Sequence, residues 1–292
     1  MDVAEVRRFN RMVTQRVGAL QEDYLARGRP LGEDRVLWEI GAAGCDVRSL
    51  RARLDLDSGY VSRLLRSLER AGLVRVEPST ADARVRMARL TSKGLAERQV
   101  LDERSDQLAT AILEPLSEGQ RQRLVVAMDE VTRLLTASMV RVEVMDPRLP
   151  AAQYCLSEYF AELARRFDAG FDPARSISAG NAELTLPAGL LLVATLHAEP
   201  VGCGGLKLHG DEPAEIKRMW VSPDARGLGL GRRLLSELER TAAAHHAPAV
   251  RLETNHHLTE AIALYRSAGY QEVPPFNNEP YAHHWFEKAL IV

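Results

Sequence analysis

The stretch SPDARGLGLGRRLL, residues 222–235, carries three glycines at alternate positions directly before a helical pattern of apolar residues. Glycine lets backbone N–H groups approach a ligand closely, because it has no Cβ. The start of a helix adds unpaired N–H donors and the positive end of a dipole. The stretch therefore predicts a pyrophosphate-binding loop, to which Arg226 and Arg232 would add positive charge.

The sequence around this loop predicts a sheet with helices. A strand, EIKRMWV (215–221), leads into the loop, and a helix over 229–246 follows it. Strands are also expected at 190–197, 201–209, 249–255 and 283–290, and helices at 151–167 and 259–269. Strands that first form a meander and then alternate with helices indicate a mixed α/β sheet. The glycine spacing matches neither G-x-G-x-x-G nor a Walker loop, so the loop alone does not select the ligand.

The form Arg-x-x-Gly-x-Gly, made by Arg226, Gly229 and Gly231, resembles the pyrophosphate loop of the GNAT acetyltransferases. LETNHHLTEAIALYRSAGYQEV (252–273) resembles the next motif of that family, and the likeness covers about residues 150–290. It implies acetyl-CoA as co-substrate, and direct attack of a small-molecule amine in a ternary complex. It also implies that backbone amides of the strand pair with pantetheine. The residues expected to bind acetyl-CoA are Met219, Val221, Arg226, Gly227, Gly229, Gly231, Arg232 and Asn255.

The resemblance also suggests two catalytic residues. Tyr265 stands where family members often place a phenol that protonates the departing thiolate, although a packing tyrosine would fit the same pattern. Glu215 is the candidate base, acting through water. Strand alternation would put Glu215, Lys217, Met219 and Val221 on one face. A Glu215–Lys217 ion pair is the alternative.

The polar loop at residues 277–281 is expected to touch the acceptor, with Asn277 and Tyr281 as substrate-binding residues; a plain surface loop is the alternative. The pairs His245–His246, His256–His257 and His283–His284 resemble metal ligands. Neighbours on a strand point to opposite faces, however, so we expect no metal site.

The first half has a different charge balance. Residues 48–93 hold eleven Lys or Arg against five Asp or Glu, whereas residues 146–292 hold fourteen against eighteen. This asymmetry suggests an anionic partner for the first half. Helices are expected at 5–28, at 32–44 with Asp34 as cap, at 47–56, and at 58–72. Two strands at 73–78 and 84–91 follow, and then long helices from 92 and from 117.

Two short helices followed by a two-stranded ribbon form a winged helix-turn-helix pattern, whose second helix enters the major groove of DNA. SGYVSRLLRSLERAGLV (58–74), the wing DARVRMARLT (82–91) and SKG (92–94) resemble the MarR family over residues 1–142. The family implies a homodimer reading a palindromic operator in double-stranded DNA, with Asp82 orienting Arg84. A solvated helix face is the alternative. The expected DNA-binding residues are Ser58, Tyr60, Ser62, Arg63, Arg66, Asp82, Arg84 and Arg86.

Length and composition agree with two globular domains. The chain has 292 residues, of which 46% are hydrophobic and 27% charged. We expect a mostly α winged helix-turn-helix domain over residues 1–145 and a mixed-sheet α/β acetyltransferase domain over 146–292. The N-terminus has no apolar core of a signal peptide, and the apolar run at 189–196 is too short to span a membrane. A cytoplasmic protein without membrane attachment is therefore expected.

Two other functions fit the same residues. The second domain could be a CoA-responsive binding module of a regulator, or it could acetylate a protein lysine. A wide acidic groove would favour a protein acceptor, and a closed pocket would favour a metabolite. Whether acetyl-CoA or the acceptor also tunes DNA binding is open.

Overall fold

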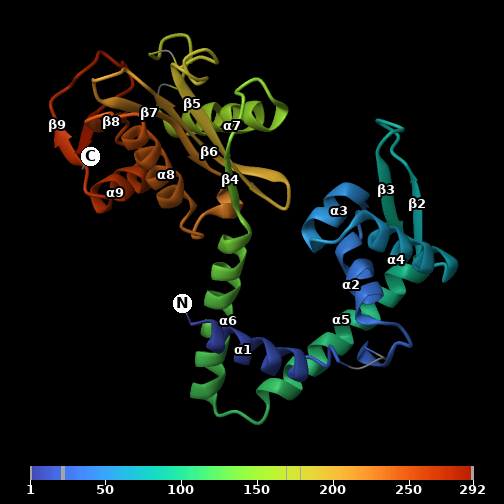
Figure 1. Cartoon of the computed structure of the whole chain (residues 1–292). Helices are drawn as coiled ribbons and strands as arrows, with labels where there is room; N and C mark the ends of the chain where they lie inside the picture. Colours follow the sequence, from blue (N-terminus) through green and yellow to red (C-terminus); the bar gives the residue numbers. More distant parts are fainter. Residues whose placement is uncertain (1, 21–23, 169, 178, 291–292) are drawn as a thin grey trace. The chain divides into compact units, whose positions relative to one another are not determined.

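The computed structural model describes residues 2–20, 24–168, 170–177 and 179–290 (Figure 1). The chain forms two compact units, Met1–Asp129 and Glu130–Val292, which are described separately. The division falls within helix α6 (Glu118–Met139), whereas the sequence places the boundary between residues 145 and 146. Among the described residues, no helix combines the length and the apolar composition that a membrane span requires.

The first unit packs helices around a small antiparallel sheet. The buried face of α4 carries Val61, Leu64, Leu65 and Leu68 at helical spacing, and this face closes the core against α2. The sheet order is β1-β3-β2. The elements are α1 (Val3–Arg16), the 3-10 turn η1 (Tyr24–Ala26), α2 (Leu31–Ile40), β1 (Cys45–Asp46), α3 (Val47–Leu54), α4 (Ser58–Arg70), β2 (Val74–Pro78), β3 (Arg86–Leu90) and α5 (Ser92–Leu113).

Two predictions for this unit were wrong. The first helix ends at Arg16 rather than at residue 28, because Gly18 adopts a left-handed φ of 72° that a helix cannot continue through. Residues 21–23 of the predicted helix lie outside the described residues. Asp34 does not cap α2, since the helix begins after Pro30 and Asp34 is 2% exposed inside it. Its carboxylate instead accepts a hydrogen bond from Arg29 Nε at 2.8 Å.

The second unit is a seven-stranded sheet in the order β4-β5-β6-β7-β8-β10-β9. Every neighbouring pair is antiparallel except β7 and β8, which run parallel. The predictions did not include the edge strand β4. The elements are β4 (Arg141–Val144), α7 (Pro150–Arg166), β5 (Gly189–Leu196), β6 (Glu199–Lys207), β7 (Ala214–Val221), the 3-10 turn η2 (Pro223–Ala225), α8 (Leu230–Ala244), β8 (Ala249–Thr254), α9 (Thr259–Ser267), β9 (Gln271–Val273) and β10 (His284–Ala289).

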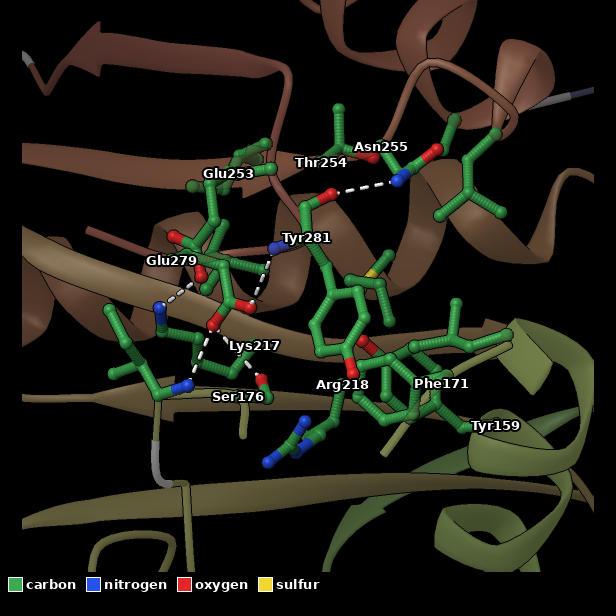
Figure 2. Close-up of a pocket in the computed structure, with 18 of the residues that line it drawn as sticks. Tyr159, Phe171, Ser176, Lys217, Arg218, Glu253, Thr254, Asn255, Glu279 and Tyr281 are labelled. Atoms are coloured by element: carbon green, nitrogen blue, oxygen red, sulfur yellow. Dashed lines mark hydrogen bonds and ion pairs between the residues drawn. The ribbon is translucent and has the colours of Figure 1, made fainter. Parts of the chain in front are cut away.

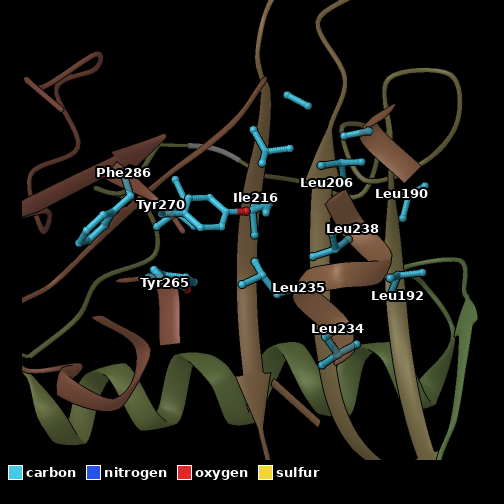
Figure 3. Close-up of a cluster of buried hydrophobic side chains, with 14 of the residues drawn as sticks. Leu190, Leu192, Leu206, Ile216, Leu234, Leu235, Leu238, Tyr265, Tyr270 and Phe286 are labelled. Carbon is cyan, nitrogen blue, oxygen red and sulfur yellow. The ribbon is translucent and has the colours of Figure 1, made fainter. Parts of the chain in front are cut away.

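Helices cover both faces of this sheet. Alternate residues of β5 separate into two cores: Leu190 and Leu192 pack with α8, whereas Leu191 and Val193 pack with α7. Figure 3 shows the leucines of α8 directed at strand side chains such as Leu206. The helix α8 packs closely because Gly204 has no side chain. A Cβ there would lie 2.9 Å from Leu238 Cδ1.

The parallel pair β7 and β8 separates along its length. Within the described ranges, the two strands pair only at their starts, Ala214 with Val250 and Glu215 with Arg251. From Ile216 onward, the edge of β7 that faces β8 pairs with no described strand. Backbone donors and acceptors on a free strand edge need partners. The separation therefore creates a place where a ligand can pair with β7.

Candidate acetyl-CoA and acceptor site

The glycine-rich loop opens the N-terminus of α8. Gly227 and Gly229 have φ of 82° and 73°, a conformation that glycine adopts without cost. Gly229 is the N-cap of α8 and offers no side-chain acceptor to the first N–H groups of the helix. Gly231 lies in the first turn, where a Cβ would come within 3.3 Å of Leu264. The helix terminus is thus bare and able to bind an anion.

The two loop arginines already have partners. Arg226 Nη2 donates to both carboxylate oxygens of Glu162, at 2.8 and 2.7 Å. Arg232 donates to the hydroxyl of Ser267. Glu162 also accepts a hydrogen bond from Trp220 Nε1 at 3.0 Å, so α7 holds Arg226 beside the loop.

A cavity of about 590 Å³ runs along this loop, and we call it the loop cavity. Its lining includes the loop residues predicted to bind a cofactor, together with the free end of β7. Its lining also reaches α9 at Tyr265. The predicted cofactor residues that line it are Met219, Val221, Arg226, Gly227, Gly229, Gly231 and Arg232.

A smaller cavity of about 90 Å³, the inner cavity, lies between the separated ends of β7 and β8 (Figure 2). Tyr159, Met219 and Tyr265 line both cavities, so Tyr265 stands where the two meet. Burial, with smaller contributions from Tyr159 and Glu253, raises the pKa of Tyr265. Its phenol is therefore neutral at neutral pH and able to donate a proton.

A β-bulge in β7 changes the predicted faces of this strand. Cys203 pairs with Trp220 and Gly205 pairs with Lys217, so two residues of β7 stand opposite Gly204. Met219 and Val221 consequently pack with the α8 core, whereas Lys217 forms ion pairs with Glu215 and Glu253. The prediction that Glu215, Lys217, Met219 and Val221 share one face was wrong, because the bulge inserts one residue into the alternation.

Glu215 lines neither cavity. Its carboxylate accepts a hydrogen bond from Arg251 at 2.8 Å and lies 3.3 Å from the Lys217 ammonium. Burial would raise the pKa of Glu215, but Lys217 and Arg251 outweigh burial and lower that pKa. The Glu215–Lys217 ion pair that was the alternative is thus present within β7, and Arg251 of β8 adds a cross-strand ion pair. The role of Glu215 as a base stays a prediction.

Two other buried carboxylates line the inner cavity. Glu253, on β8, accepts hydrogen bonds from the ammonium of Lys217 and from Asn277 Nδ2. Glu279 is 8% exposed and accepts from Ser176 Oγ at 2.9 Å and from the N–H of Ile177 at 2.7 Å. Figure 2 shows both carboxylates on the same side of the Tyr281 side chain.

The predicted polar loop forms a wall of the inner cavity. Asn255 Nδ2 donates to the Tyr281 carbonyl at 2.7 Å, which ties the end of β8 to this loop. Tyr281 lines the cavity, with its ring 4.7 Å from the ring of Phe171. Asn277 does not line the cavity, but its Oδ1 accepts from Trp285 Nε1 at 2.9 Å and its amide contacts Glu253. Asn255 lines the inner cavity rather than the loop cavity.

His256 and His257 do not point to opposite faces, as was expected of neighbouring histidines. Their ring centroids are 4.0 Å apart, and the ring of His283 lies 4.3 Å from that of His256. Residues 256–257 lie in a turn after β8, where strand alternation does not apply. Within the described ranges, no group of three or more His, Cys, Asp or Glu side chains is placed to hold a metal ion.

The predicted DNA-binding residues lie on the surface of the first unit. Asp57 caps α4 by accepting from the Tyr60 N–H at 2.8 Å, and the Arg63 guanidinium lies over the Tyr60 ring at 5.5 Å. At the wing tip, Asp82 Oδ1 accepts from the backbone N–H of Arg84 at 2.9 Å and from its Nε at 3.3 Å. Of the predicted residues, Ser62 is half-buried and the rest are exposed: Ser58, Tyr60, Arg63, Arg66, Asp82, Arg84 and Arg86.

Comparison with known proteins identifies both units. Residues 156–270 match the family model described as acetyltransferase (GNAT) family, and residues 30–85 match that of the MarR family. The chain is 36% identical to the N-alpha-acetyltransferase RimI of Mycobacterium tuberculosis over 116 residues, 39% of this chain and 71% of that protein. The chain belongs to the GNAT family. The predicted fusion of a MarR-type unit with a GNAT acetyltransferase unit is confirmed.

Other relatives of this GNAT domain align over shorter lengths. It is 42% identical over 86 residues to a protein named IAA acetyltransferase from Azospirillum brasilense, 29% of this chain. The chain spans 56% of that relative and 59% of a Schizosaccharomyces pombe N-acetyltransferase. A GNAT-family acetyltransferase structure from Staphylococcus aureus shares 20% identity and a TM-score of 0.45, covering 52% of this chain and all of that one.

The GNAT match ends at residue 270, before the loop that carries Glu279 and Tyr281. Glu253 and Arg218 line the inner cavity, and neither is among the site residues predicted from the sequence. Glu253 directly precedes the strand end at Thr254 in the second GNAT motif, which is a signal that could have drawn attention to it. The sequence gives no such signal for Arg218, because the direction in which its side chain points depends on the β-bulge.

Proposed function

We propose that the GNAT domain transfers the acetyl group of acetyl-CoA to an amine of a small metabolite. The observation that carries this proposal is Tyr265, which stands where the loop cavity meets the inner cavity. The bare N-terminus of α8 would bind the pyrophosphate, and the free edge of β7 would pair with pantetheine. The thioester would then lie beside Tyr265, with the acceptor in the inner cavity.

The reaction proposed is direct attack in a ternary complex. The acceptor ammonium loses a proton through water to a carboxylate; Glu215 is the predicted base, and Glu253 and Glu279 line the cavity itself. The amine nitrogen bonds to the thioester carbonyl carbon, and the carbon–sulfur bond breaks. Tyr265 donates its phenolic proton to the departing thiolate, for which its raised pKa keeps it protonated. The attacking nitrogen loses its second proton as the amide forms, and that proton restores the phenol.

The size of the inner cavity supports a small acceptor over a protein lysine. At about 90 Å³, and lined in part by Phe167, Phe171 and Tyr281, it is a small pocket rather than a wide acidic groove. A CoA-responsive binding module without catalysis would not need a buried phenol between two cavities.

The test is release of free thiol from acetyl-CoA with a panel of amino acids, polyamines and a histone-like peptide. We expect turnover with a small amine, and a fall in kcat of about 10²-fold or more for Tyr265→Phe. Tyr270→Phe is the matched control, because Tyr270 is equally buried and lines neither cavity. Acetyl-CoA binding without turnover across the panel would favour the binding-module alternative.

We also propose that the MarR-family unit binds double-stranded DNA as a homodimer. The support is the row of exposed arginines on α4 and the wing, with Arg84 held by Asp82. Selection of bound sequences from random duplex DNA, followed by titration with and without acetyl-CoA, tests this proposal and any coupling. A selected site without two-fold symmetry would contradict the homodimer.

A further inference from the structure

Arg218 brings an unbalanced positive charge to the inner cavity. Among the described residues it has no ion-pair partner, and its Nε is buried without a hydrogen bond. The guanidinium lies over aromatic rings instead, 4.8 Å from the Phe160 centroid and 5.7 Å from that of Tyr159. Arg218 is half-buried, and partial burial of a guanidinium without a carboxylate is costly, so the site favours an anion that arrives from outside.

The backbone directs this side chain to the cavity. Arg218 has a φ of 57°, which non-glycine residues seldom adopt. It belongs to the bulge opposite Gly204, and the bulge turns Arg218 toward α7 and the cavity rather than into the α8 core. Strained positions of this kind concentrate at ligand sites. Figure 2 shows the guanidinium below the Tyr281 ring.

Glu279 brings the opposite charge to the same cavity. It is 8% exposed, and the groups that donate to it are all neutral: Ser176 Oγ, the N–H of Ile177 and the N–H of Tyr281. Among the described residues it has no cationic partner, in contrast to Glu253, which pairs with Lys217. Besides the Lys217–Glu253 pair, the inner cavity therefore holds one acidic and one basic side chain that have no ion-pair partner among the described residues.

We propose that the acceptor is a free amino acid, whose carboxylate binds Arg218 and whose amine lies beside Glu279. A zwitterion supplies both missing charges at once, which neither a polyamine nor an amine without a carboxylate does. Arg218 also lines a third cavity of about 490 Å³, with Phe160 and Ala179, which has room for an amino-acid side chain. This inference rests on the proposed function, because it names the substrate class of the same site.

The test measures binding to the full chain saturated with CoA, by calorimetry, so that it does not depend on turnover. The probes are the twenty free amino acids, their carboxamides and the corresponding decarboxylated amines. We expect at least one free amino acid to bind about 100-fold or more tighter than its carboxamide. Arg218→Gln should abolish this preference, leave carboxamide binding unchanged and retain CoA affinity.

Two further variants complete the experiment. Arg218→Lys keeps the charge on the same backbone and should restore part of the preference for the carboxylate. Arg165→Gln removes an exposed arginine of α7 and should behave as the wild type. If Arg218→Gln does not fold, as judged by CoA affinity, the preference of the wild type and of Arg218→Lys decides the question.

The outcomes separate this inference from the function it rests on. Tight binding of a free amino acid without acetyl transfer would refute the proposed reaction and leave the recognition intact. Turnover of the carboxamide as fast as of the free amino acid would overturn the inference, and would point to peptide N-termini instead. Failure of every free amino acid to bind would also overturn it, as would an unchanged preference in Arg218→Gln.

Discussion

The charges of the wing and those of the inner cavity have opposite environments. Arg84 and Asp82 form a pair whose side chains are 90% and 46% exposed, whereas Lys217 and Glu253 form a pair whose side chains are 7% and 9% exposed. The first pair can do little for stability, because water screens it. The Lys217–Glu253 pair has lost most of its contact with water, so each charge depends on the other and on nearby hydrogen bonds for its stability. A pair of opposite charges thus adds little to stability in the wing, whereas such a pair holds together the wall of a cavity in the second unit.

The largest expected effect is on the buried pair. Lys217→Met would leave Glu253 and Glu215 buried without their ammonium, and should lower the free energy of unfolding by about 3–5 kcal/mol. Urea unfolding, with hydrogen exchange read in β7 and β8, measures this. Lys288→Met is the matched control, because its pair with Glu239 is more exposed at 28% and 15%. Equal losses for the two variants would contradict the contrast between buried and exposed charge.

A half-buried cluster in the first unit, Glu97 with Arg27 and Arg29, predicts acid sensitivity. Hydrogen bonds from Arg27 and Arg29, opposed by burial, lower the pKa of Glu97 from 4.5 to about 2. Because the pKa of Glu97 is lower in the folded protein than in the unfolded chain, its ionised carboxylate stabilises the fold at pH values above 4.5. This stabilisation is lost as the pH falls from 4.5 toward 2. Glu97→Gln should cost about 2 kcal/mol at pH 7 and flatten the pH dependence in that window. Hydrogen exchange in α2 and α5 measures this, and a variant with the acid sensitivity of the wild type would refute it.

The exposed charges should affect DNA affinity. Arg63→Ala should weaken operator binding by about 1–3 kcal/mol, through a lost base or phosphate contact. Fluorescence anisotropy over a range of salt concentrations distinguishes a base contact from a phosphate contact. Loss of a phosphate contact reduces the slope of log affinity against log salt concentration by about one. Arg16→Ala on α1 is the control. If both variants bind equally, α4 is a solvated helix face.

The smallest expected effect is on the stability of the wing. Asp82→Ala should change the free energy of unfolding by less than about 0.5 kcal/mol, because the pair is exposed. It should still reduce DNA affinity, since Arg84 would lose the carboxylate that orients it. Thermal unfolding and anisotropy on the same sample measure both. A large loss of stability would show that the wing pair is structural.

Much of the fold could be predicted because its signals are local. The apolar spacing of α4, the alternating wing strands and the glycines before α8 each depend on neighbouring residues. Errors occurred where a single backbone conformation changes the pattern. Gly18 ended the first helix early, and the bulge at Arg218 moved Met219 and Val221 to the other face of β7. The edge strand β4 was missed because it is short and its side chains are mostly exposed.

By itself, the sequence determined the two families, the glycine loop at the start of α8, the exposed basic face of α4 and the place of Tyr265 in the second GNAT motif. These depend on residue type and spacing along the chain. Only the tertiary structure decided that Glu215 is held in an ion pair, that Glu279 and Arg218 enter one cavity, and that neither has a charged partner among the described residues. Burial and pairing of charge are properties of residues far apart in the chain, and a one-residue bulge reverses the direction of a side chain.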